Sequence, residues 1–328
     1  MDETDTLILS QLQANGRLSN RVIARSLGVP ERQIATRIRD MLAADDMRIL
    51  LVADLFAAGF EHVLFIGVEV AGRPARAVAE ELAALPEVIS VMLSMGSEDI
   101  ELVMVAENHA RLVSVALEYL SRIPGIRRHT LSLGLSILKY STEMGPLVPG
   151  PPSGEMIAIP EGGAMDRLDR EIVNRLWIDP RMTNQRVASE LAISESAVRA
   201  RLQSLRERNV VHITAMRNMR MESGSVFASI GVEVAGREVE TVAAELAALP
   251  ETGFVAIVLG RYDILVMGLL GNPGELERLL AERIEPLSGV SKVHTSQVLG
   301  FVKYDVRWTA LGVANAVGVP PSSKESAC

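Results

Sequence analysis

The chain contains one sequence twice, and the two copies stay in register over most of its length. The segment IGVEVAGR occupies residues 66–73 and again 230–237, and ELAALPE occupies residues 81–87 and again 245–251. The same offset of 164 residues, without insertion or deletion, joins Asp5 to Asp169, Arg37 to Arg201, Gly96 to Gly260, Asp99 to Asp263, Gly125 to Gly289 and Lys139-Tyr140 to Lys303-Tyr304. A unit this long is a duplicated subunit rather than a solenoid repeat of about 20–50 residues. One chain can therefore supply the symmetry that a homodimer would otherwise provide.

Size and composition indicate a globular protein with several domains. The chain has 328 residues, of which 48% are hydrophobic, and this length predicts two to four domains. The only cysteine is Cys328, which excludes a disulfide framework and indicates a reducing compartment. The first residues do not resemble a signal peptide, and no apolar run approaches the roughly 20 residues of a membrane span. We therefore expect a cytoplasmic protein without membrane contact.

The net charge of −8 conceals an uneven distribution of arginines. Residues 1–50 carry seven acids and seven arginines, whereas residues 165–220 carry seven acids and eleven arginines, which leaves a charge of +4. The segment that follows each of them is acidic. Because the local field attracts a phosphate backbone, the overall negative charge does not exclude nucleic acid.

The first part of each copy has the pattern of a helix-turn-helix domain. Apolar residues recur at helical spacing in three successive segments separated by turn signals. The expected helix N-caps are Ser19, Thr183 and Ser194. The short apolar runs at 48–53 and 212–216 are typical of a wing or a connecting strand. We therefore predict winged helix-turn-helix domains over residues 1–53 and 165–217, which we name the first and second headpieces.

The remaining part of each copy alternates strand and helix patterns in the order βαββαβ. The expected elements lie near residues 62–70, 74–84, 88–95, 99–106, 108–121 and 126–138, and again near 226–234, 238–248, 253–259, 263–270, 273–285 and 290–302. This order is that of the ferredoxin-like sandwich, in which both helices cover one face of the sheet. The other face needs a cover, and the second copy is the obvious candidate. We assign ferredoxin-like ligand domains to residues 54–141 and 218–310, and the fold class is α+β.

Two segments lack any periodic pattern. Residues 142–164 include five prolines and five glycines, and they are typical of a flexible linker. About 20 residues span at most about 60–70 Å, which lets the second copy fold back beside the first. Residues 311–328 are rich in small residues and are typical of a disordered tail.

The third helix of each headpiece is a candidate DNA-binding element. If Ile34, Ile38 and Met41 face inward, the groups that face outward or lie on the flanks are Arg32, Gln33, Thr36, Arg37 and Arg39 in the first copy, and Ser196, Arg199, Ala200, Arg201 and Gln203 in the second. Arginines and short polar groups donate to phosphates and reach base edges in a major groove. In isolation the pattern favours a solvated helix face, but the helix-turn-helix context, occurring twice, favours DNA contact. Arg37 and Arg201 are the strongest candidates for phosphate contacts because they keep register between the copies.

A glycine turn separates the two middle strands of each ligand domain. It consists of Gly96, Ser97, Glu98 and Asp99 in the first copy, and of Gly260, Arg261, Tyr262 and Asp263 in the second. Glycine permits a positive φ, and main-chain N–H groups beside a carboxylate can hold the two ends of a zwitterion. The spacing alone favours a simpler interpretation, a tight turn in which the aspartate caps its own backbone.

The sequence carries little that is typical of an enzyme. No two of the five histidines coincide under the 164-residue offset, and no pair has the spacing of metal ligands. Neither a dinucleotide-binding nor a phosphate-cradling glycine motif is present. We therefore expect no catalytic residues, no metal and no cofactor.

Together these motifs resemble the Lrp/AsnC family of feast/famine regulators. Three motifs carry the resemblance in each copy: D-xx-I-xxx-L at Asp5 and Asp169, the recognition-helix frame V/I-xx-R-I/L-xx-L/M from Ile34 and Val198, and the G-x-x-D turn at Gly96 and Gly260. Each motif is weak alone, but the six occur in order and extend over residues 5–141 and 169–305.

The resemblance implies a sequence-specific transcription regulator that binds double-stranded DNA and is not an enzyme. In that family the ferredoxin-like domain, called RAM, pairs with that of a partner. It binds a small effector, usually an amino acid, at the G-x-x-D turn. The resemblance therefore implies an intrachain pseudo-dimer, homo-oligomers of such chains, and the eight turn residues as effector-binding candidates.

The two copies depart from the family pattern to different degrees. Ser194 keeps the usual cap of the recognition helix, whereas Pro30 replaces it in the first copy and offers no side-chain cap. The first headpiece is neutral where the second is positive, and Glu98 stands where the second turn has Tyr262. We expect the second copy to dominate DNA affinity and to be the better effector site.

Two other functions are compatible with the same scaffold. A sirohaem-decarboxylase-like enzyme resembles this family, but it needs histidine and arginine in the ligand domain, and residues 88–106 contain neither. An architectural DNA-binding protein would differ from the regulator only in lacking an effector response.

Overall fold

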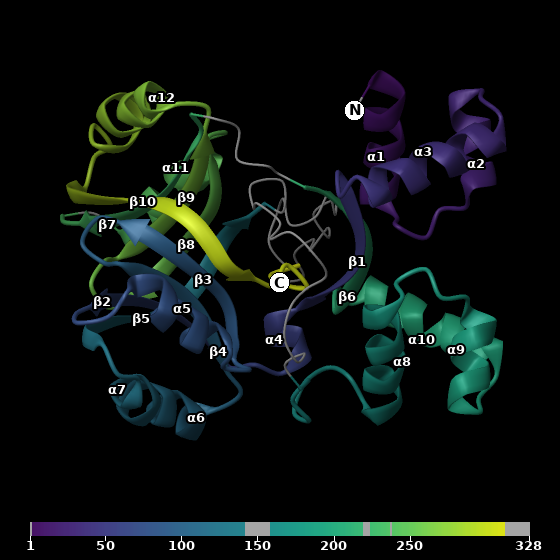
Figure 1. Ribbon diagram of the computed structural model, residues 1–328, viewed down its shortest axis with the longest axis horizontal. Coiled ribbons are helices and arrows are strands. Elements are labelled where there is room, and N and C mark those ends of the chain that lie inside the picture. Colours follow the sequence, from purple (N-terminus) through teal and green to yellow (C-terminus); the bar gives the residue numbers. More distant parts are fainter. Residues whose placement is uncertain (1, 142–157, 219–223, 237, 312–328) are drawn as a thin grey trace, which may run out of the picture. The chain divides into compact units, whose positions relative to one another are not determined.

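The computed structural model describes residues 2–141, 158–218, 224–236 and 238–311, and it divides into two compact units (Figure 1). Unit 1 combines residues 1–59, 161–219 and 307–328 and so contains both headpieces, whereas unit 2 combines residues 60–160 and 220–306 and contains both ligand domains. Most of the expected linker, residues 142–157, and nearly all of the expected tail, from residue 312, lie outside the described residues. The two headpieces therefore lie in one unit and the two ligand domains in the other.

Each headpiece in unit 1 is built from three helices. They are α1 (Glu3–Ala14), α2 (Asn20–Leu27) and α3 (Glu31–Ala43) in the first, and α8 (Arg167–Ile178), α9 (Asn184–Leu191) and α10 (Glu195–Glu207) in the second. Ser19, Thr183 and Ser194 cap α2, α9 and α10 as expected, and Pro30 gives α3 no side-chain cap. The predicted inward stripe of Ile34, Ile38 and Met41 is buried.

A two-stranded antiparallel ribbon joins the two headpieces. It consists of β1 (Met47–Asp54), which leads into the short helix α4 (Leu55–Ala58), and β6 (Val211–Arg217). The ribbon centres on Leu50 opposite Thr214, which are equivalent residues of the two copies, as two-fold symmetry requires. The runs expected to form a wing or a connecting strand are therefore connecting strands that pair between the copies.

A third strand completes this sheet from the far end of the chain. β11 (Trp308–Thr309) pairs in parallel with β1. The rings of Trp308 and Trp177 of α8 lie 5.1 Å apart, and Trp177 Nε1 donates to the main-chain oxygen of Leu51 at 3.1 Å. Residues 307–310, which we expected in the second ligand domain, therefore belong to unit 1, because the buried tryptophan packs there.

Both ligand domains in unit 2 have the expected βαββαβ order. The first comprises β2 (His62–Val70), α5 (Ala75–Ala83), β3 (Val88–Met95), β4 (Ile100–Ala106), a helix made of α6 (His109–Ser114), η1 (Val115–Tyr119) and α7 (Leu120–Arg122), and β5 (Ile126–Tyr140). The second comprises β7 (Val226–Val234), α11 (Val239–Ala248), β8 (Thr252–Leu259), β9 (Ile264–Leu270), α12 (Pro273–Arg278) with η3 (Leu279–Ile284), and β10 (Val290–Tyr304). The helices cover one face of each sheet, around cores that include Leu102 and Val266.

The two sheets of unit 2 close into one barrel, in the order β10-β3-β4-β2-β5-β8-β9-β7. The two junctions between the copies are β5 with β8 and β10 with β3, and their registers are equivalent under the duplication. The second copy thus covers the open sheet face of the first, as expected, and it also pairs with it strand to strand. Closure leaves no unpaired sheet edge between the copies.

One lysine of each copy hydrogen-bonds to the end of a helix in the other copy. Lys139 Nζ on β5 donates to the main-chain oxygen of Leu249 at 2.7 Å, just past the end of α11. The equivalent Lys303 on β10 donates to the main-chain oxygens of Ala83 and Leu85, at 3.0 and 3.3 Å, at the end of α5. A cation at a helix C-terminus satisfies free carbonyl groups and suits the helix dipole. The repeated Lys-Tyr pair therefore has a role in joining the copies.

Within the described part of the chain, no helix combines the length and the hydropathy that crossing a membrane requires.

Candidate functional site

The outer faces of α3 and α10 carry the residues predicted to contact DNA. The exposed ones are Arg32, Gln33 and Arg39 on α3, and Ser196, Arg199, Ala200 and Gln203 on α10. Thr36, Arg37 and Arg201 are partly buried. Seven of the ten predicted residues are therefore exposed, and the contact of the set with DNA stays a prediction.

The two arginines that keep register between the copies have carboxylate partners. Each donates to both aspartates of the capping box that opens the first helix of its own headpiece: Arg37 to Asp2 and Asp5 at 2.7 and 2.8 Å, and Arg201 to Asp166 and Asp169 at 2.6 and 2.8 Å. The main-chain N–H of the partner aspartate and then the guanidinium lower the pKa of Asp2 and of Asp166. Arg37 and Arg201 therefore tie the recognition helix to the first helix, and this role explains their conserved register with Asp5 and Asp169.

The headpieces differ most in arginines that only the second one has. Five positions that hold small or apolar residues in the first copy hold arginine in the second: Val22 and Arg186, Ala35 and Arg199, Leu42 and Arg206, Ala44 and Arg208, and Ala53 and Arg217. Val22 and Leu42 are exposed apolar side chains. Conversely, Ser196 and Gln203 replace Arg32 and Arg39. The recognition surfaces of the two copies are therefore chemically different.

A groove of about 340 Å³ lies between the headpieces within unit 1. Its basic lining comes from Arg17 of the first headpiece and from Arg199 and Arg206 of the second. Arg17 also donates to Asn184 Oδ1 at 2.8 Å, and Arg181, its equivalent, donates to the main-chain oxygen of Leu18 at 3.0 Å. Arg17, which helps to dock the two headpieces, thus lines the same groove as Arg199 and Arg206 of the second recognition helix.

In the ligand domains, the two glycine turns pack against the other copy. A Cβ at Gly96 would collide with Ser296, and a Cβ at Gly260 would collide with Ser132. Asp99 and Asp263 accept main-chain N–H groups of the neighbouring strands, from Val70 at 2.7 Å and from Val234 at 2.8 Å. Glycine is therefore needed at both turns because a strand of the other copy packs closely against it. The aspartates stabilise the turns through hydrogen bonds to the neighbouring strands.

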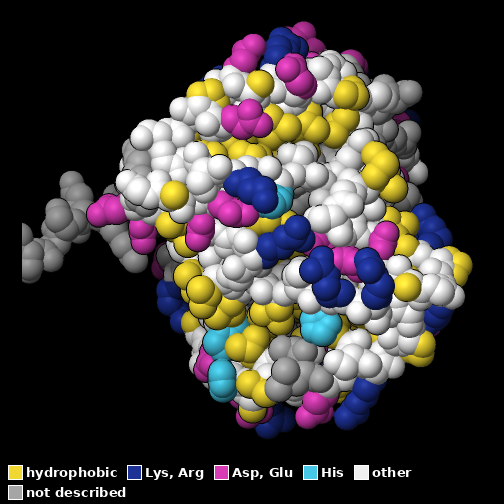
Figure 2. Space-filling view, turned by 90° about the vertical axis from the view of Figure 1, so that its left-hand side faces the viewer, with side chains coloured by type: hydrophobic (Ala, Val, Ile, Leu, Met, Phe, Trp, Pro, Cys, Tyr) yellow, Lys and Arg dark blue, Asp and Glu magenta, His cyan; other side chains and the backbone are white. Residues whose placement is uncertain are grey.

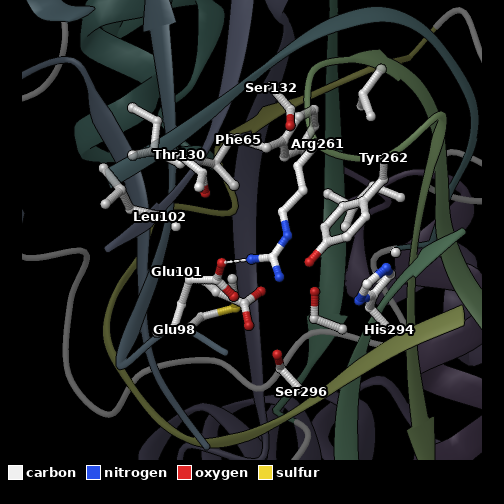
Figure 3. Close-up of a pocket in the computed structure, with 18 of the residues that line it drawn as sticks. Phe65, Glu98, Glu101, Leu102, Thr130, Ser132, Arg261, Tyr262, His294 and Ser296 are labelled. Atoms are coloured by element: carbon white, nitrogen blue, oxygen red, sulfur yellow. Dashed lines mark hydrogen bonds and ion pairs between the residues drawn. The ribbon is translucent and has the colours of Figure 1, made fainter. Parts of the chain in front are cut away.

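A chamber of about 50 Å³ lies inside the barrel beside these turns (Figure 3). Its polar lining comes from both copies: Glu98, Glu101, Thr130 and Ser132 from the first, and Ser229, Arg261, Tyr262, His294 and Ser296 from the second. Of the eight predicted effector residues, Glu98, Arg261 and Tyr262 line this barrel chamber. Gly96, Ser97, Asp99, Gly260 and Asp263 do not.

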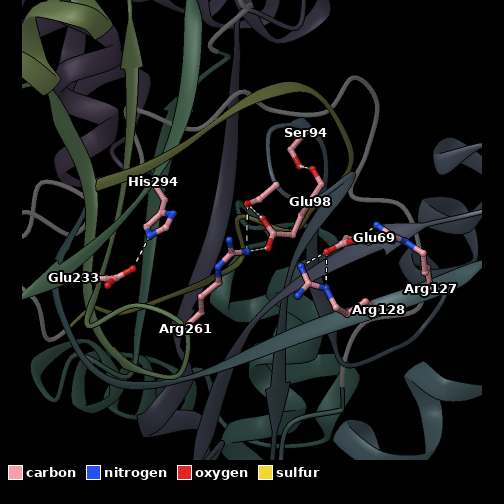
Figure 4. A network of polar contacts seen from close by, with 9 residues as sticks. Glu69, Ser94, Glu98, Arg127, Arg128, Glu233, Arg261 and His294 are labelled. Carbon is pink, nitrogen blue, oxygen red and sulfur yellow. Dashed lines mark hydrogen bonds and ion pairs between the residues drawn. The ribbon is translucent and has the colours of Figure 1, made fainter. Parts of the chain in front are cut away.

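An ion pair between the copies crosses the chamber (Figure 4). Arg261 donates to the buried carboxylate of Glu98 and, at 3.3 Å, to Ser97 Oγ. His294 Nε2 lies 2.6 Å from Glu233 Oε1, and hydrogen bonding to this histidine lowers the pKa of Glu233. The two predicted turns are thus joined to each other through Arg261.

Further ion pairs lie close to this one. Glu69 pairs with Arg127 and Arg128, which lower the pKa of its carboxyl, and Arg261 adds to that effect. Figure 2 shows basic, acidic and histidine side chains gathered near the middle of one face of unit 2. Arg261 therefore lines the chamber and also acts on the charge cluster of Glu69, Arg127 and Arg128.

Glu101 is the functional candidate that the sequence alone did not reveal. It lies on β4 and its side chain enters the chamber. Burial raises the pKa of its carboxyl, Ser229 opposes this, and the charge of Glu98 reinforces it. The sequence did contain a signal for Glu101: it is an acidic residue at a position where the second copy has an apolar one, Leu265.

Other lining residues also come from outside the predicted turns. His294 and Ser229 lie on β10 and β7, far along the chain from residues 96–99. Residues 88–106 contain neither arginine nor histidine, which from sequence alone weighed against the sirohaem-decarboxylase alternative. Closure of the barrel brings Arg261 and His294 to that turn from the second copy.

Among the described residues, no group of three or more histidine, cysteine, aspartate or glutamate side chains is arranged to hold a metal ion.

Comparison with protein families matches both parts of each copy. The family model described as the Lrp/AsnC ligand binding domain matches residues 63–144 and 225–308. The model described as the AsnC-type helix-turn-helix domain matches residues 1–42 and 165–206. Each domain type therefore occurs twice, with the spacing of the internal repeat.

Similar proteins correspond to one copy or to both. An uncharacterised HTH-type transcriptional regulator of Pyrococcus furiosus is 36% identical over 141 residues, which are 43% of this chain and 95% of that protein. One from Pyrococcus abyssi is 33% identical over 141 residues, which are 43% of this chain and 89% of that protein. The crystal structure of the siroheme decarboxylase NirDL covers 92% of this chain and 93% of its own, with a TM-score of 0.67 and 18% identity. At that identity the likeness shows a shared fold.

Proposed function

Because this chain belongs to the Lrp/AsnC family of transcription regulators, we propose that it binds DNA through both headpieces as a single-chain counterpart of a dimer. The observation that carries the proposal is the ribbon of β1 and β6, which holds two recognition helices in one unit around the equivalent residues Leu50 and Thr214. A pair of headpieces related by two-fold symmetry suits a DNA site with two half-sites.

The second headpiece supplies most of the DNA affinity in this proposal. Its recognition helix carries Arg199, whose side chain is 70% exposed, where the first has Ala35. Its segment is also positive where the first is neutral, and phosphate neutralisation dominates affinity for DNA. The exposed residues Arg32, Gln33 and Arg39 give the first headpiece a weaker contact with a different sequence preference.

Arg37 and Arg201 act mainly by positioning. Each guanidinium already binds two carboxylates, so a phosphate contact would be a second task for a group that holds the headpiece together. The sequence-based assignment of phosphate contact passes to the exposed arginines of the same helices.

The effector in this proposal is an amino acid or a related small metabolite, and it binds at the barrel chamber. Three of the turn residues assigned from the sequence, Glu98, Arg261 and Tyr262, line the chamber and come from different copies. A ligand there contacts both halves of the pseudo-dimer, so its binding energy can act on their junction.

Further assembly into homo-oligomers is supported by apolar side chains at equivalent positions of both copies. Leu135 and Leu299 are exposed where β-bulges interrupt the junction strands β5 and β10. Met95 and Leu259, also equivalent, are exposed on the paired strands. Large apolar side chains repeated on a surface favour contact with another chain.

The charges of the chamber lining favour the regulator over the sirohaem-decarboxylase alternative. Arg261, the arginine of the described lining, is paired with Glu98, whereas a tetrapyrrole with several carboxylates needs free cations. Incubation with such substrates, followed by absorbance spectroscopy, should therefore show neither binding nor product.

Selection from a random duplex library tests the main proposal. We expect the full chain to enrich a motif with two unequal half-sites and to bind it with an affinity that falls steeply as salt rises. Failure to bind any duplex at low salt would overturn it.

A further inference from the structure

The barrel chamber contains a buried carboxyl group, that of Glu101, with one oxygen atom that no described residue hydrogen-bonds. Glu101 Oε1 is shielded from solvent and has no hydrogen-bond partner in the part of the chain that the structure describes. An unpaired buried carboxyl oxygen is costly, so such a group in a native protein needs a physical reason. The side chain enters the chamber because its neighbours on β4, Ile100 and Leu102, belong to the core under the helices.

The groups around Glu101 favour a cationic partner. Hydrogen bonding of its carboxyl to Ser229, Ser296 and Ser94 opposes the rise of its pKa on burial and leaves Oε1 without a partner among the described residues. Elsewhere in the lining, the charges of Glu98 and Arg261 offset each other. Glu101 is thus the acid without a cation in the described lining, and oxygen atoms surround it. Such a setting suits a group with several N–H donors and a positive charge.

This arrangement occurs once in each chain. The second copy has Leu265 at the position of Glu101 and Val258 at that of Ser94, and the first copy has Phe65 and Ser132 at the positions of Ser229 and Ser296. A homodimer would present two identical sites, whereas in the duplicated chain only one of the two equivalent positions in the chamber holds this carboxylate.

We propose that each chain binds one small ligand bearing a primary ammonium group, which lies against Glu101 and the hydroxyl groups of Ser229 and Ser296. The chamber of about 50 Å³ admits the head of such a molecule. The remainder extends toward Arg261, whose side chain is 28% exposed at the rim. This inference rests on the effector part of the proposed function and deepens it, because it identifies the group that is recognised and the number of ligands.

Proton release accompanies binding in this arrangement. Burial raises the pKa of Glu101, so the ligand-free carboxyl is more often protonated than an exposed one. An ammonium group favours the carboxylate form, so binding expels a proton and the affinity rises with pH until Glu101 is ionised in the free chain. The other titratable groups that face the chamber are Glu98, Arg261, Tyr262 and His294.

Calorimetry and thermal shift on the full chain test the proposal with a fixed panel. The panel contains the twenty common amino acids, the amines that lack their carboxylate, and the acids that lack their amino group. We expect at least one amino acid and its amine to stabilise the chain, and the matching acid to have no effect. We expect a stoichiometry of one per chain and proton release that shows in buffers of different ionisation enthalpy. If no amine binds, if the acid binds as well, or if two ligands bind, the proposal is wrong.

Substitution separates a ligand-binding role from a structural one. Glu101→Leu introduces the residue of the second copy, and the ligand-free variant should melt at or above the wild-type temperature while losing the response to amines. Glu107→Leu, at an exposed position, is the matched control and should keep that response. A Glu101→Leu variant that melts earlier and still responds to amines would overturn the proposal. Failure of the wild-type chain to bind DNA would instead count against the regulator function alone.

Discussion

At the level of single residues, the two copies place different amino acids at the same left-handed backbone position. The turn after the second helix of each headpiece needs a left-handed residue, and it is Gly28 with φ +68° in the first copy but Ala192 with φ +53° in the second. Alanine pays a steric cost in this conformation that glycine does not. The second headpiece therefore carries local strain beside its recognition helix.

Exchange of these two residues tests that strain. Ala192→Gly should stabilise the second headpiece by about 1 kcal/mol, and Gly28→Ala should destabilise the first by a similar amount. An added Cβ at Gly28 meets no atom within 4 Å, so the backbone alone sets the effect. Hydrogen exchange of the headpiece amides measures both changes, and equal protection in all chains would contradict the argument.

The pH dependence of stability tests the burial of Glu101. Its folded-state pKa lies above the ordinary value of 4.5, so above that pH the folded chain binds more protons than the unfolded chain. Stability conferred by the protonated form is therefore complete below about pH 4.5 and is lost as the pH rises to the folded pKa. Relative to Glu101→Gln, the wild-type free energy of unfolding should fall over this window. A difference that is independent of pH from 4 to 8 would refute the burial argument.

At the scale of elements, each copy completes the other. The ends of α11 and α5 receive their cation from the last strand of the opposite copy, Lys139 or Lys303. Each ligand domain thus has the elements of its fold but lacks one helix cap and two strand partners until the other copy is present. This dependence explains why both copies keep the same register of strands.

Removal of these lysines should weaken the junction. Lys139→Met and Lys303→Met each remove a charged donor from main-chain carbonyl groups at a helix end, and each should cost about 1–3 kcal/mol. Lys292→Met, at an exposed position of β10, is the control and should stay within about 0.5 kcal/mol of wild type. Urea unfolding followed by circular dichroism compares the three variants. Equal midpoints would show that the caps carry no stability.

The elements themselves were predictable from sequence, but their pairing between copies was not. Periodicity and turn residues marked the βαββαβ order and the three helices of each headpiece within a few residues. Periodicity says which face of a strand is buried, but not whether its edge meets its own copy or the other. The pairing of Leu50 with Thr214 and the meeting of Glu98 with Arg261 therefore required the structure, as did the two-residue strand at Trp308.

At the scale of the whole molecule, duplication converts a symmetric dimer into one chain whose halves can diverge. In unit 2 this produces a single acidic chamber, and in unit 1 it produces two recognition surfaces with different charge. A homodimer cannot do this, because each substitution would appear at both sites.

The proposed assembly of chains into homo-oligomers can be tested at the exposed leucines of the two β-bulges. Leu135→Glu combined with Leu299→Glu places charge on both exposed bulges and should convert oligomers into single chains at micromolar concentration, because it desolvates charge at an apolar contact. Light scattering measures the mass. Phe56→Glu, also at an exposed apolar position but in unit 1, is the control and should leave the mass unchanged. An unchanged mass in the double variant would show that these bulges are not the assembly surface.

The central claim is that one chain holds two headpieces as a fixed pair, and half-site spacing tests it most directly. The full chain is titrated onto the selected duplex and onto one with about 5 bp, half a helical turn, inserted between the half-sites. We expect the insertion to lower the affinity to that of a single half-site, because the ribbon of β1 and β6 cannot follow the half-site around the DNA. Equal affinity for both duplexes would contradict it.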